Sequence, residues 1–274
     1  MRSLNEQELA YISGHIKSKY GVDLEVGKIP IESRLGYYLS SKGFQTYSDY
    51  FKFAKRDSEG ELADLVYRLT TKQTSLLREK EQFEAFRGIV LPWIESLPDG
   101  YNLRLWSTGC GAGEEPYSIS ISILEYYMTK RRLDDPSLNT TILASDISDR
   151  ALSAASEGIY LHKKLSAMPP EWASKYFIDL GNGSFRVSPG LRANVAFKKI
   201  NLLDKYAIRR PFHTIFCRDV LSYFDLGLRK AMIDYFYGIM AAGAYLFIGQ
   251  TESLANLKHG FQYVQPSVYR KPRQ

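Results

Sequence analysis

Two patterns of apolar residues divide this chain, and the division constrains its fold more than any other feature of the sequence. Up to about residue 90, apolar residues recur at helical spacing, as in Leu9, Ile12 and Ile16. After Asp99-Gly100, short β-rich runs alternate with helical ones. Such alternation predicts a parallel sheet covered on both faces by helices. We therefore predict a helical domain over residues 1–90 and an α/β domain over residues 91–274.

The expected elements follow from local signals. Ser3 and Glu6 form a capping-box pattern before the first helix, and Gly21 is a plausible stop. The other predicted helices cover residues 31–42, 47–54, 62–69, 79–92, 115–127, 149–156 and 228–240. The predicted strands cover residues 102–107, 140–145, 194–200, 213–217 and 244–249. Residues 160–192 interrupt the alternation, and Gly181-Asn182-Gly183 between 175–180 and 184–188 predicts a small β-hairpin insert there.

Composition narrows the class of protein. Hydrophobic residues make up 45% of the 274 residues, enough for a packed core, and no apolar stretch reaches the roughly 18–20 residues of a membrane span. The N-terminus turns polar at once, so we expect a cytoplasmic protein that is not inserted in a membrane. Cys110 and Cys217 lie in no metal-ligand pattern, so we expect no metal. The net charge of +6 favours an acidic partner without naming one.

The strongest local signal is a glycine loop between a strand and a helix, at residues 109–113. Its glycines, Gly109 and Gly111 among them, allow a tight turn and a close approach of a ligand to the backbone, although a plain turn without a ligand is an alternative. The spacing is GxGxG rather than the dinucleotide GxGxxG, and Glu114 and Glu115 open the helix. Carboxylates there would repel a pyrophosphate and suit a cation. This pattern favours S-adenosylmethionine, which carries a sulfonium and an ammonium group, over NAD.

Two further segments place polar residues at strand ends. Asp146 ends the strand after the glycine loop, where a carboxylate accepts hydrogen bonds from ribose hydroxyls; the alternative is a helix N-cap or loop aspartate. Residues 216–224 run from a strand into Arg218, Asp219 and Tyr223, at the sheet edge where open α/β folds bind ligands. A surface ion pair is the ordinary alternative for Arg218.

Taken together, these segments resemble the CheR family of chemotaxis receptor methyltransferases over nearly the whole chain. The matching motifs are TTKQTSLLR at 70–78, GEEPYS at 113–118, ASDI at 144–147, NLL at 201–203 and FCRDV at 216–220. The resemblance implies a Rossmann-like S-adenosylmethionine-dependent methyltransferase domain, an N-terminal all-helical domain and a small β-hairpin insert. It implies a reaction that forms methyl esters on glutamate side chains of receptor helices and leaves S-adenosylhomocysteine.

The resemblance also assigns residues. Those on positions that resemble cofactor contacts are Thr74, Arg78, Gly109, Gly111, Glu115, Asp146, Asn201, Leu202, Arg218 and Asp219. Arg78 and Tyr223 fall nearest the transferred methyl group and are the expected catalytic pair. The chain departs from the family pattern at Lys72 and Asp219, where asparagine is usual, and at Leu76-Leu77, where two phenylalanines are usual.

Two other functions stay open. A nucleic-acid methyltransferase is compatible with the basic charge, but residues 217–220 do not resemble the Asn/Asp-Pro-Pro-Tyr segment of amino-directed DNA enzymes, so we expect no nucleic-acid partner. A signalling module that binds the cofactor without transferring methyl is compatible with Lys72 and Asp219. Some CheR-like enzymes tether to a receptor's C-terminal pentapeptide through a glycine-containing loop of the insert. The short turn at 181–183 predicts that this chain does not depend on that peptide.

Overall fold

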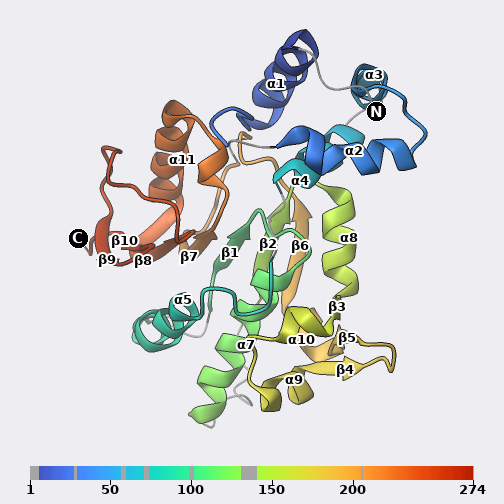
Figure 1. The fold of residues 1–274 in the computed structure, drawn as a ribbon. Helices are drawn as coiled ribbons and strands as arrows, with labels where there is room; N and C mark the ends of the chain where they lie inside the picture. Colours follow the sequence, from blue (N-terminus) through green and yellow to red (C-terminus); the bar gives the residue numbers. More distant parts are fainter. Residues whose placement is uncertain are drawn as a thin grey trace.

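The chain begins with a set of helices set apart from the sheet (Figure 1). The structure, a computed structural model, describes residues 6–27, 30–56, 60–70, 74–98, 102–130, 141–204 and 206–273. The first helices are α1 (Glu6–Tyr20), α2 (Ile31–Ser41), α3 (Tyr47–Arg56) and α4 (Gly60–Thr70). In α1 the buried side chains Ile12, Ile16 and Tyr20 recur at helical spacing, as predicted. Ser3, the expected capping residue, lies outside the described residues.

A run of three helical pieces leads to the sheet. These are α5 (Lys80–Ala85), the π-helical turn η1 (Phe86–Val90) and α6 (Leu91–Glu95). The sequence predicted one helix here and gave no sign of the π turn. The predicted domain division between residues 90 and 91 falls inside this run, and the division itself stays a prediction. Phe86 packs edge-on against Phe216 and Phe247 of the sheet, with ring centroids 5.4 and 6.2 Å away.

The central sheet has seven strands in the order β6-β2-β1-β7-β8-β10-β9. They are β1 (Leu105–Thr108), β2 (Ile142–Asp146), β6 (Val195–Lys199), β7 (Phe212–Cys217), β8 (Met240–Ile248), β9 (Gln262–Gln265) and β10 (Val268–Arg270). The five strands from β6 to β8 pair in parallel, as predicted. Two further strands extend this parallel sheet at the β8 side, where β10 runs antiparallel to both β8 and β9. This C-terminal pair was not foreseen from the sequence.

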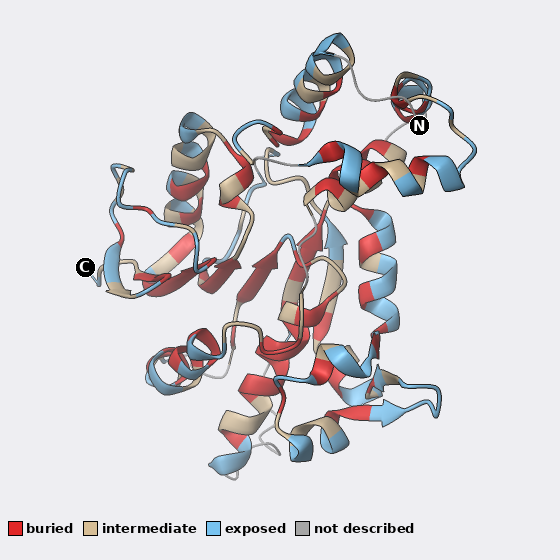
Figure 2. Cartoon of the chain, viewed as in Figure 1, coloured by how far each residue is buried: buried red, intermediate tan, exposed pale blue. Residues whose placement is uncertain are grey.

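Burial explains why the sheet forms. All four residues of β1 are buried, and the central strands form the most continuously buried part of the molecule (Figure 2). Trp106 of β1 packs between Phe212 and Phe236, while the rings of Phe216 and Phe247 stack with centroids 4.4 Å apart. The helices that connect the parallel strands are α7 (Glu114–Thr129), α8 (Asp149–Glu157) and α11 (Leu226–Ile239). None of the described helices is both long and apolar enough to cross a membrane.

The expected insert is present and larger than a hairpin. It contains β3 (Ile159–Leu161), the 3-10 turn η2 (His162–Leu165), α9 (Pro170–Tyr176), β4 (Phe177–Asp179), β5 (Ser184–Val187) and α10 (Pro189–Ala193). The predicted pair β4 and β5 is antiparallel, and β3 adds a third strand on the other side of β5. In the turn, the left-handed residues are Gly181 and Gly183, with φ of +75° and +76°.

Candidate functional site

One cavity collects the polar residues that the sequence singled out. It lies where β1, β2, β6 and β7 end, next to the point at which the strand order reverses between β1 and β7, the usual ligand position in open α/β sheets. All eleven predicted site residues line it: Thr74, Arg78, Gly109, Gly111, Glu115, Asp146, Asn201, Leu202, Arg218, Asp219 and Tyr223. The end of α1 and the last turn of α4 complete its wall through Tyr20, Val66, Tyr67 and Thr70.

The glycine loop adopts backbone conformations that favour glycine. Gly109 and Gly111 have φ of +61° and +54°. A Cβ at Gly109 would lie 2.7 Å from a methyl of Val220, so this glycine also permits the close approach of the β7 loop. Between them, the backbone N–H of Cys110 donates to the carbonyl of Ser145, at 2.9 Å. The loop is therefore tied to β2.

Asp146 is a buried carboxylate, 7% exposed, that anchors the same loop. Its Oδ2 accepts the backbone N–H of Gly111 and its Oδ1 that of Ser148, both at 3.0 Å. A carboxylate has about four lone-pair sites, so acceptor capacity remains for a ligand's hydroxyl groups. The helix N-cap is Ser148, whose side chain accepts from Ala151. Burial raises the pKa of Asp146, against the backbone hydrogen bonds that favour its charged form.

Arg218 forms a buried ion-pair network at the end of β7. Its side chain is 6% exposed; Nη1 lies 3.2 Å from Oε2 of Glu115, and Nη2 lies 2.9 Å from Oε2 of Glu79. Nη2 also donates to the backbone carbonyl of Arg78, at 2.8 Å. Burial raises the pKa of Glu115, and Arg218 and the hydroxyl of Ser107 act in the opposite direction. The surface-pair alternative for Arg218 is therefore wrong.

The other helix-opening carboxylate belongs to a cluster that the sequence did not reveal. Oε1 of Glu114 lies 2.8 Å from Nζ of Lys164, a residue of the insert, and accepts the hydroxyl of Thr74 at 2.8 Å. Each glutamate at the start of α7 thus already holds a protein cation. The expectation that these carboxylates are available to a cationic ligand is therefore corrected, because both already pair with protein cations. Lys164 lies fifty residues from Glu114, so no local spacing could have indicated it.

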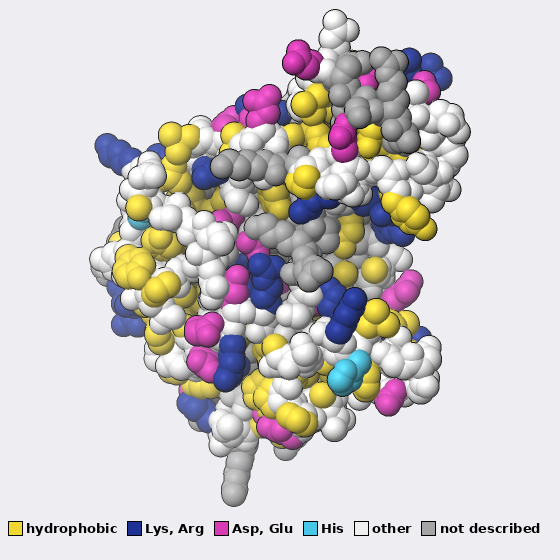
Figure 3. Space-filling view, viewed as in Figure 1, with side chains coloured by type: hydrophobic (Ala, Val, Ile, Leu, Met, Phe, Trp, Pro, Cys, Tyr) yellow, Lys and Arg dark blue, Asp and Glu magenta, His cyan; other side chains and the backbone are white. Residues whose placement is uncertain are grey.

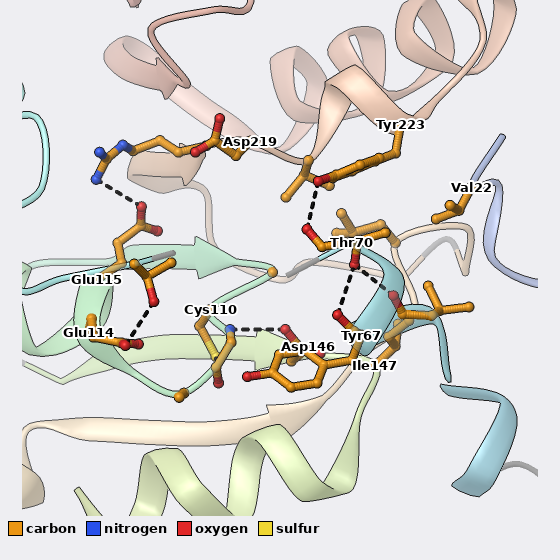
Figure 4. Close-up of a pocket in the computed structure, with 18 of the residues that line it drawn as sticks. Val22, Tyr67, Thr70, Cys110, Glu114, Glu115, Asp146, Ile147, Asp219 and Tyr223 are labelled. Carbon is orange, nitrogen blue, oxygen red and sulfur yellow. Dashed lines mark hydrogen bonds and ion pairs between the residues drawn. The ribbon is translucent and has the colours of Figure 1, made fainter. Parts of the chain in front are cut away.

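Arg78, which precedes α5, and Tyr223, which follows β7, both line the cavity. Nη2 of Arg78 lies 3.2 Å from Oδ2 of Asp219, and the Arg78 side chain is 32% exposed. The hydroxyl of Tyr223, in the 3-10 turn η3 (Leu221–Tyr223), donates to the carbonyl of Thr70 at 2.6 Å. Figure 4 shows Tyr223, Asp219, Glu115 and Asp146 arranged around one space.

The remaining predicted residues also have defined positions. The amide nitrogen of Asn201 donates to the backbone carbonyl of Lys19, at 2.9 Å, which joins the end of β6 to α1. Leu76 and Leu77 are buried in the core and do not line the cavity, so the exchange of phenylalanine for leucine there affects packing. Lys72 lies outside the described residues. Within the described ranges no group of three or more His, Cys, Asp or Glu side chains is placed to hold a metal ion.

Comparison with known proteins places the chain among methyltransferases. Residues 72–270 match the family model described as CheR methyltransferase, SAM binding domain. A chemotaxis protein methyltransferase of Borreliella burgdorferi is 33% identical over 275 residues, covering 98% of this chain and 95% of the relative. Chemotaxis protein methyltransferase 1 of Pseudomonas aeruginosa is 33% identical over 244 residues, 88% of each chain. The solved structure of PKMT2 from Rickettsia typhi with AdoHcy is a remote likeness, with a TM-score of 0.37 and 13% identity over 65% of this chain and 26% of that one.

Proposed function

We propose a specific reaction for this chain, which belongs to the CheR methyltransferase family: transfer of a methyl group from S-adenosylmethionine to glutamate side chains of chemoreceptors, in the cytoplasm. The observation that carries the proposal is the contrast between the two arginines of the cavity. Each lies between two carboxylates, Arg78 at 3.2 Å from Asp219 and 3.8 Å from Glu79, but the Arg218 side chain is 6% exposed whereas that of Arg78 is 32% exposed on the cavity wall. Arg78 is thus the arginine of this wall that an incoming carboxylate reaches from solvent.

The cofactor's place follows from the hydrogen-bonding capacity that remains in the cavity. Asp146 keeps acceptor capacity for the ribose hydroxyls, and the glycine loop lets the ligand approach the backbone at Gly109 and Gly111. Glu115 lies at the start of α7, and the hydroxyl of Thr74 donates to the neighbouring Glu114; the methionine part would bind beside them. Asn201 and Leu202, after β6, would flank the adenine. When bound, S-adenosylmethionine supplies an electrophilic methyl group.

The chain's contribution to the reaction is alignment. A glutamate of ordinary pKa is ionised at pH 7, so its carboxylate attacks the methyl carbon without a general base, and the carbon–sulfur bond breaks. Arg78 orients that carboxylate and leaves it ionised, because the guanidinium keeps its own protons and forms geometrically specific hydrogen bonds to carboxylates. The hydroxyl of Tyr223 donates a hydrogen bond to the backbone carbonyl of Thr70, which fixes the ring as a wall of the site. Alignment of this kind contributes up to roughly 7–11 kcal/mol.

On the face that Figure 3 presents, the surface charges fit a protein partner better than a nucleic acid. A nucleic-acid enzyme needs a continuous basic stripe that follows the phosphates. Figure 3 shows basic and acidic side chains interspersed near the middle of the face it presents. We therefore propose that the partner is the cytoplasmic helices of methyl-accepting receptors, met by the helical domain and the insert.

The test is a transfer assay with radiolabelled S-adenosylmethionine on membranes that contain the cognate receptors. Label on receptor glutamates should be released as methanol by mild base, because it is held as an ester. The matched control is a receptor in which the labelled glutamates are replaced by alanine, which should take up no label. Base-stable label would reject the glutamate reaction, label on nucleic acid would support the alternative enzyme, and calorimetric binding without transfer would support a signalling module.

A further inference from the structure

The loop after β8 contains the carboxylate of Glu252, which does not line the cavity. Gly249 follows β8, and the backbone N–H of Glu252 donates to its carbonyl at 2.9 Å, so the chain turns back on itself. Within this turn, Oε2 of Glu252 accepts the backbone N–H of Gly249 at 2.7 Å. Neither residue lines the cavity. No motif in the sequence analysis singled out Glu252.

The same carboxylate reaches across to the turn after β7. Its Oε2 accepts the backbone N–H of Asp219 at 3.0 Å, and its Oε1 accepts that of Ser222 at 2.8 Å. One side chain therefore holds three backbone amides that belong to two loops. Hydrogen bonds to an ionised carboxylate are about twice as strong as neutral ones. Burial raises the pKa of Glu252, and the amide bonds act against that shift.

The two turns are packed too closely for any side chain at Gly249. A Cβ there would lie 2.8 Å from the backbone nitrogen of Asp219 and 3.0 Å from Oε2 of Glu252. Real Cβ atoms essentially never come nearer than 3.0 Å to another group. Glycine at 249 is therefore a second, independent sign that the β8 turn is built to support the β7 turn.

The supported turn carries the groups that face the reaction. Asp219 has a left-handed φ of +59°, a conformation that costs a non-glycine residue energy and persists only where its surroundings hold it. Its carboxylate pairs with Arg78 at 3.2 Å. Tyr223 ends the same turn, directly after Ser222. Glu252 holds the backbone of this turn at both ends, at residues 219 and 222.

We propose that Glu252 is a positioning residue for methyl transfer, which sets the β7 turn so that Asp219 orients Arg78 and Tyr223 closes the wall of the site. The proposal rests on the proposed function. Glu252 touches neither cofactor nor substrate and acts only through these residues. The cofactor's other contacts, on β1, β2 and β6, do not depend on it.

The test variant is Glu252→Gln. Glutamine keeps one acceptor oxygen, and its amide nitrogen must face at least one of the three backbone N–H donors, so at most two of the bonds survive. We expect kcat to fall about 10- to 100-fold, the scale of a misplacement of about 1 Å in a reaction site. The calorimetric affinity for S-adenosylhomocysteine should change less than about threefold, since a loss confined to kcat marks an interaction made in the transition state.

The matched control is Glu95→Gln, which removes a carboxylate that accepts from Tyr126 and Lys130, away from the cavity. It should keep the wild-type kcat even if its thermal stability differs from that of the wild-type protein. The proposal is overturned if Glu252→Gln keeps the wild-type kcat. It is also overturned if kcat and cofactor affinity fall by the same factor, or if the control loses kcat equally.

A second measurement is independent of transfer. Hydrogen exchange at the amides of residues 219–223 should be faster in Glu252→Gln than in Glu95→Gln, because the bonds that protect them are lost. Equal exchange in the two variants would overturn the proposal. If the glutamine variant does not fold, Gly249→Ala replaces it, since it pushes the same two turns apart and leaves the Glu252 charge in place. If the wild-type protein methylates no receptor, the proposed function fails, while the exchange rates still decide the role of Glu252.

Discussion

Nη1 of Arg218 lies 3.2 Å from Oε2 of Glu115, and both side chains are largely withdrawn from water. The same guanidinium neutralises Glu79 on its other side. It therefore joins three segments that are distant in sequence: the approach to α5, the start of α7 and the end of β7. Because this guanidinium pairs with carboxylates of two other segments, the structure of the cavity wall depends on Arg218.

Replacing Arg218 by methionine should destabilise the protein strongly, because the largely buried carboxylates of Glu79 and Glu115 lose their nearest cation. Breaking a buried ion pair from one side costs about 3–5 kcal/mol. The measurement is the free energy of unfolding from urea denaturation. Arg209→Met, which changes an exposed arginine, is the control and should stay within about 0.5 kcal/mol of wild type. A loss in Arg218→Met as small as in this control would mean that the network contributes little.

Asp146 should govern cofactor affinity. In Asp146→Ala the ribose hydroxyls lose their acceptor, and affinity for S-adenosylhomocysteine should fall by about 1–3 kcal/mol in calorimetry. Asp149→Ala, which removes a mostly exposed carboxylate from the start of α8, should leave affinity unchanged. Unchanged affinity in Asp146→Ala itself would sink the assignment.

The affinity should also depend on pH through the same residue. Burial raises the pKa of Asp146 above the ordinary 3.8. Ribose hydroxyls donate to the ionised form, so binding lowers this pKa and affinity is greatest above it. We expect affinity to fall as pH is lowered from neutral through the raised pKa of Asp146, with proton release on binding detectable in buffers of different ionisation enthalpy. The pH dependence should be reduced in Asp146→Ala, where only other carboxylates titrate.

Local sequence patterns predicted the helices and strands that position the cavity. They could not predict contacts between segments that are distant in the sequence. Gly109 and Asp146 were placed at strand ends because strand, loop and helix follow one another within a few residues. Lys164 and Glu252 escaped because each reaches the site through a partner more than thirty residues away, Glu114 for Lys164 and Asp219 for Glu252. The strands β9 and β10 were missed because they are short and only partly apolar, and they become strands only because β10 pairs with β8 and β9 pairs with β10.

Arg78 should matter more to transfer than to folding. In Arg78→Ala the substrate carboxylate loses the cation that orients it, and kcat should fall about 100-fold. The ion pair with Asp219 is partly exposed, so its loss should change the free energy of unfolding by about 1 kcal/mol at most. Lys80→Ala, which removes an exposed cation two residues away, is the control and should transfer methyl normally. Full activity in Arg78→Ala would leave the residue a structural role only.

Asp219 orients Arg78 and should, through the same ion pair, also compete with the substrate carboxylate for it. Its carboxylate already lies 3.2 Å from the guanidinium, so a substrate glutamate must share or displace it. In Asp219→Asn the side chain keeps its shape and tolerates the left-handed backbone, but the competing charge is gone. We expect KM for the receptor to fall several-fold at low salt. Each 1.4 kcal/mol of competition that the substitution removes corresponds to about a tenfold lower KM. A KM that rises would instead show that the carboxylate assists substrate binding.

The insert's geometry bears on how the receptor is found. A tethered peptide would add a strand to an edge of the small sheet, at β3 or β4, through backbone hydrogen bonds. The turn between β4 and β5 is closed by a bond from the backbone N–H of Leu180 to the carbonyl of Ser184, at 3.0 Å. Gly181 and Gly183 take up the left-handed positions within it. A turn of four residues closed in this way leaves little backbone to meet a peptide.

We therefore expect that the protein does not depend on a receptor-tail pentapeptide, and that charged surfaces supply the recognition instead. Titration with such a pentapeptide should show no saturable binding at micromolar concentrations. Binding to receptor membranes should weaken as salt rises, because exposed charges are screened within about 10 Å at 0.1 M. A variant with the insert turn lengthened by glycine and serine after Asn182 is the matched comparison. Micromolar pentapeptide binding by the natural chain, mapped to residues 177–187, would show that the short turn does not exclude tethering.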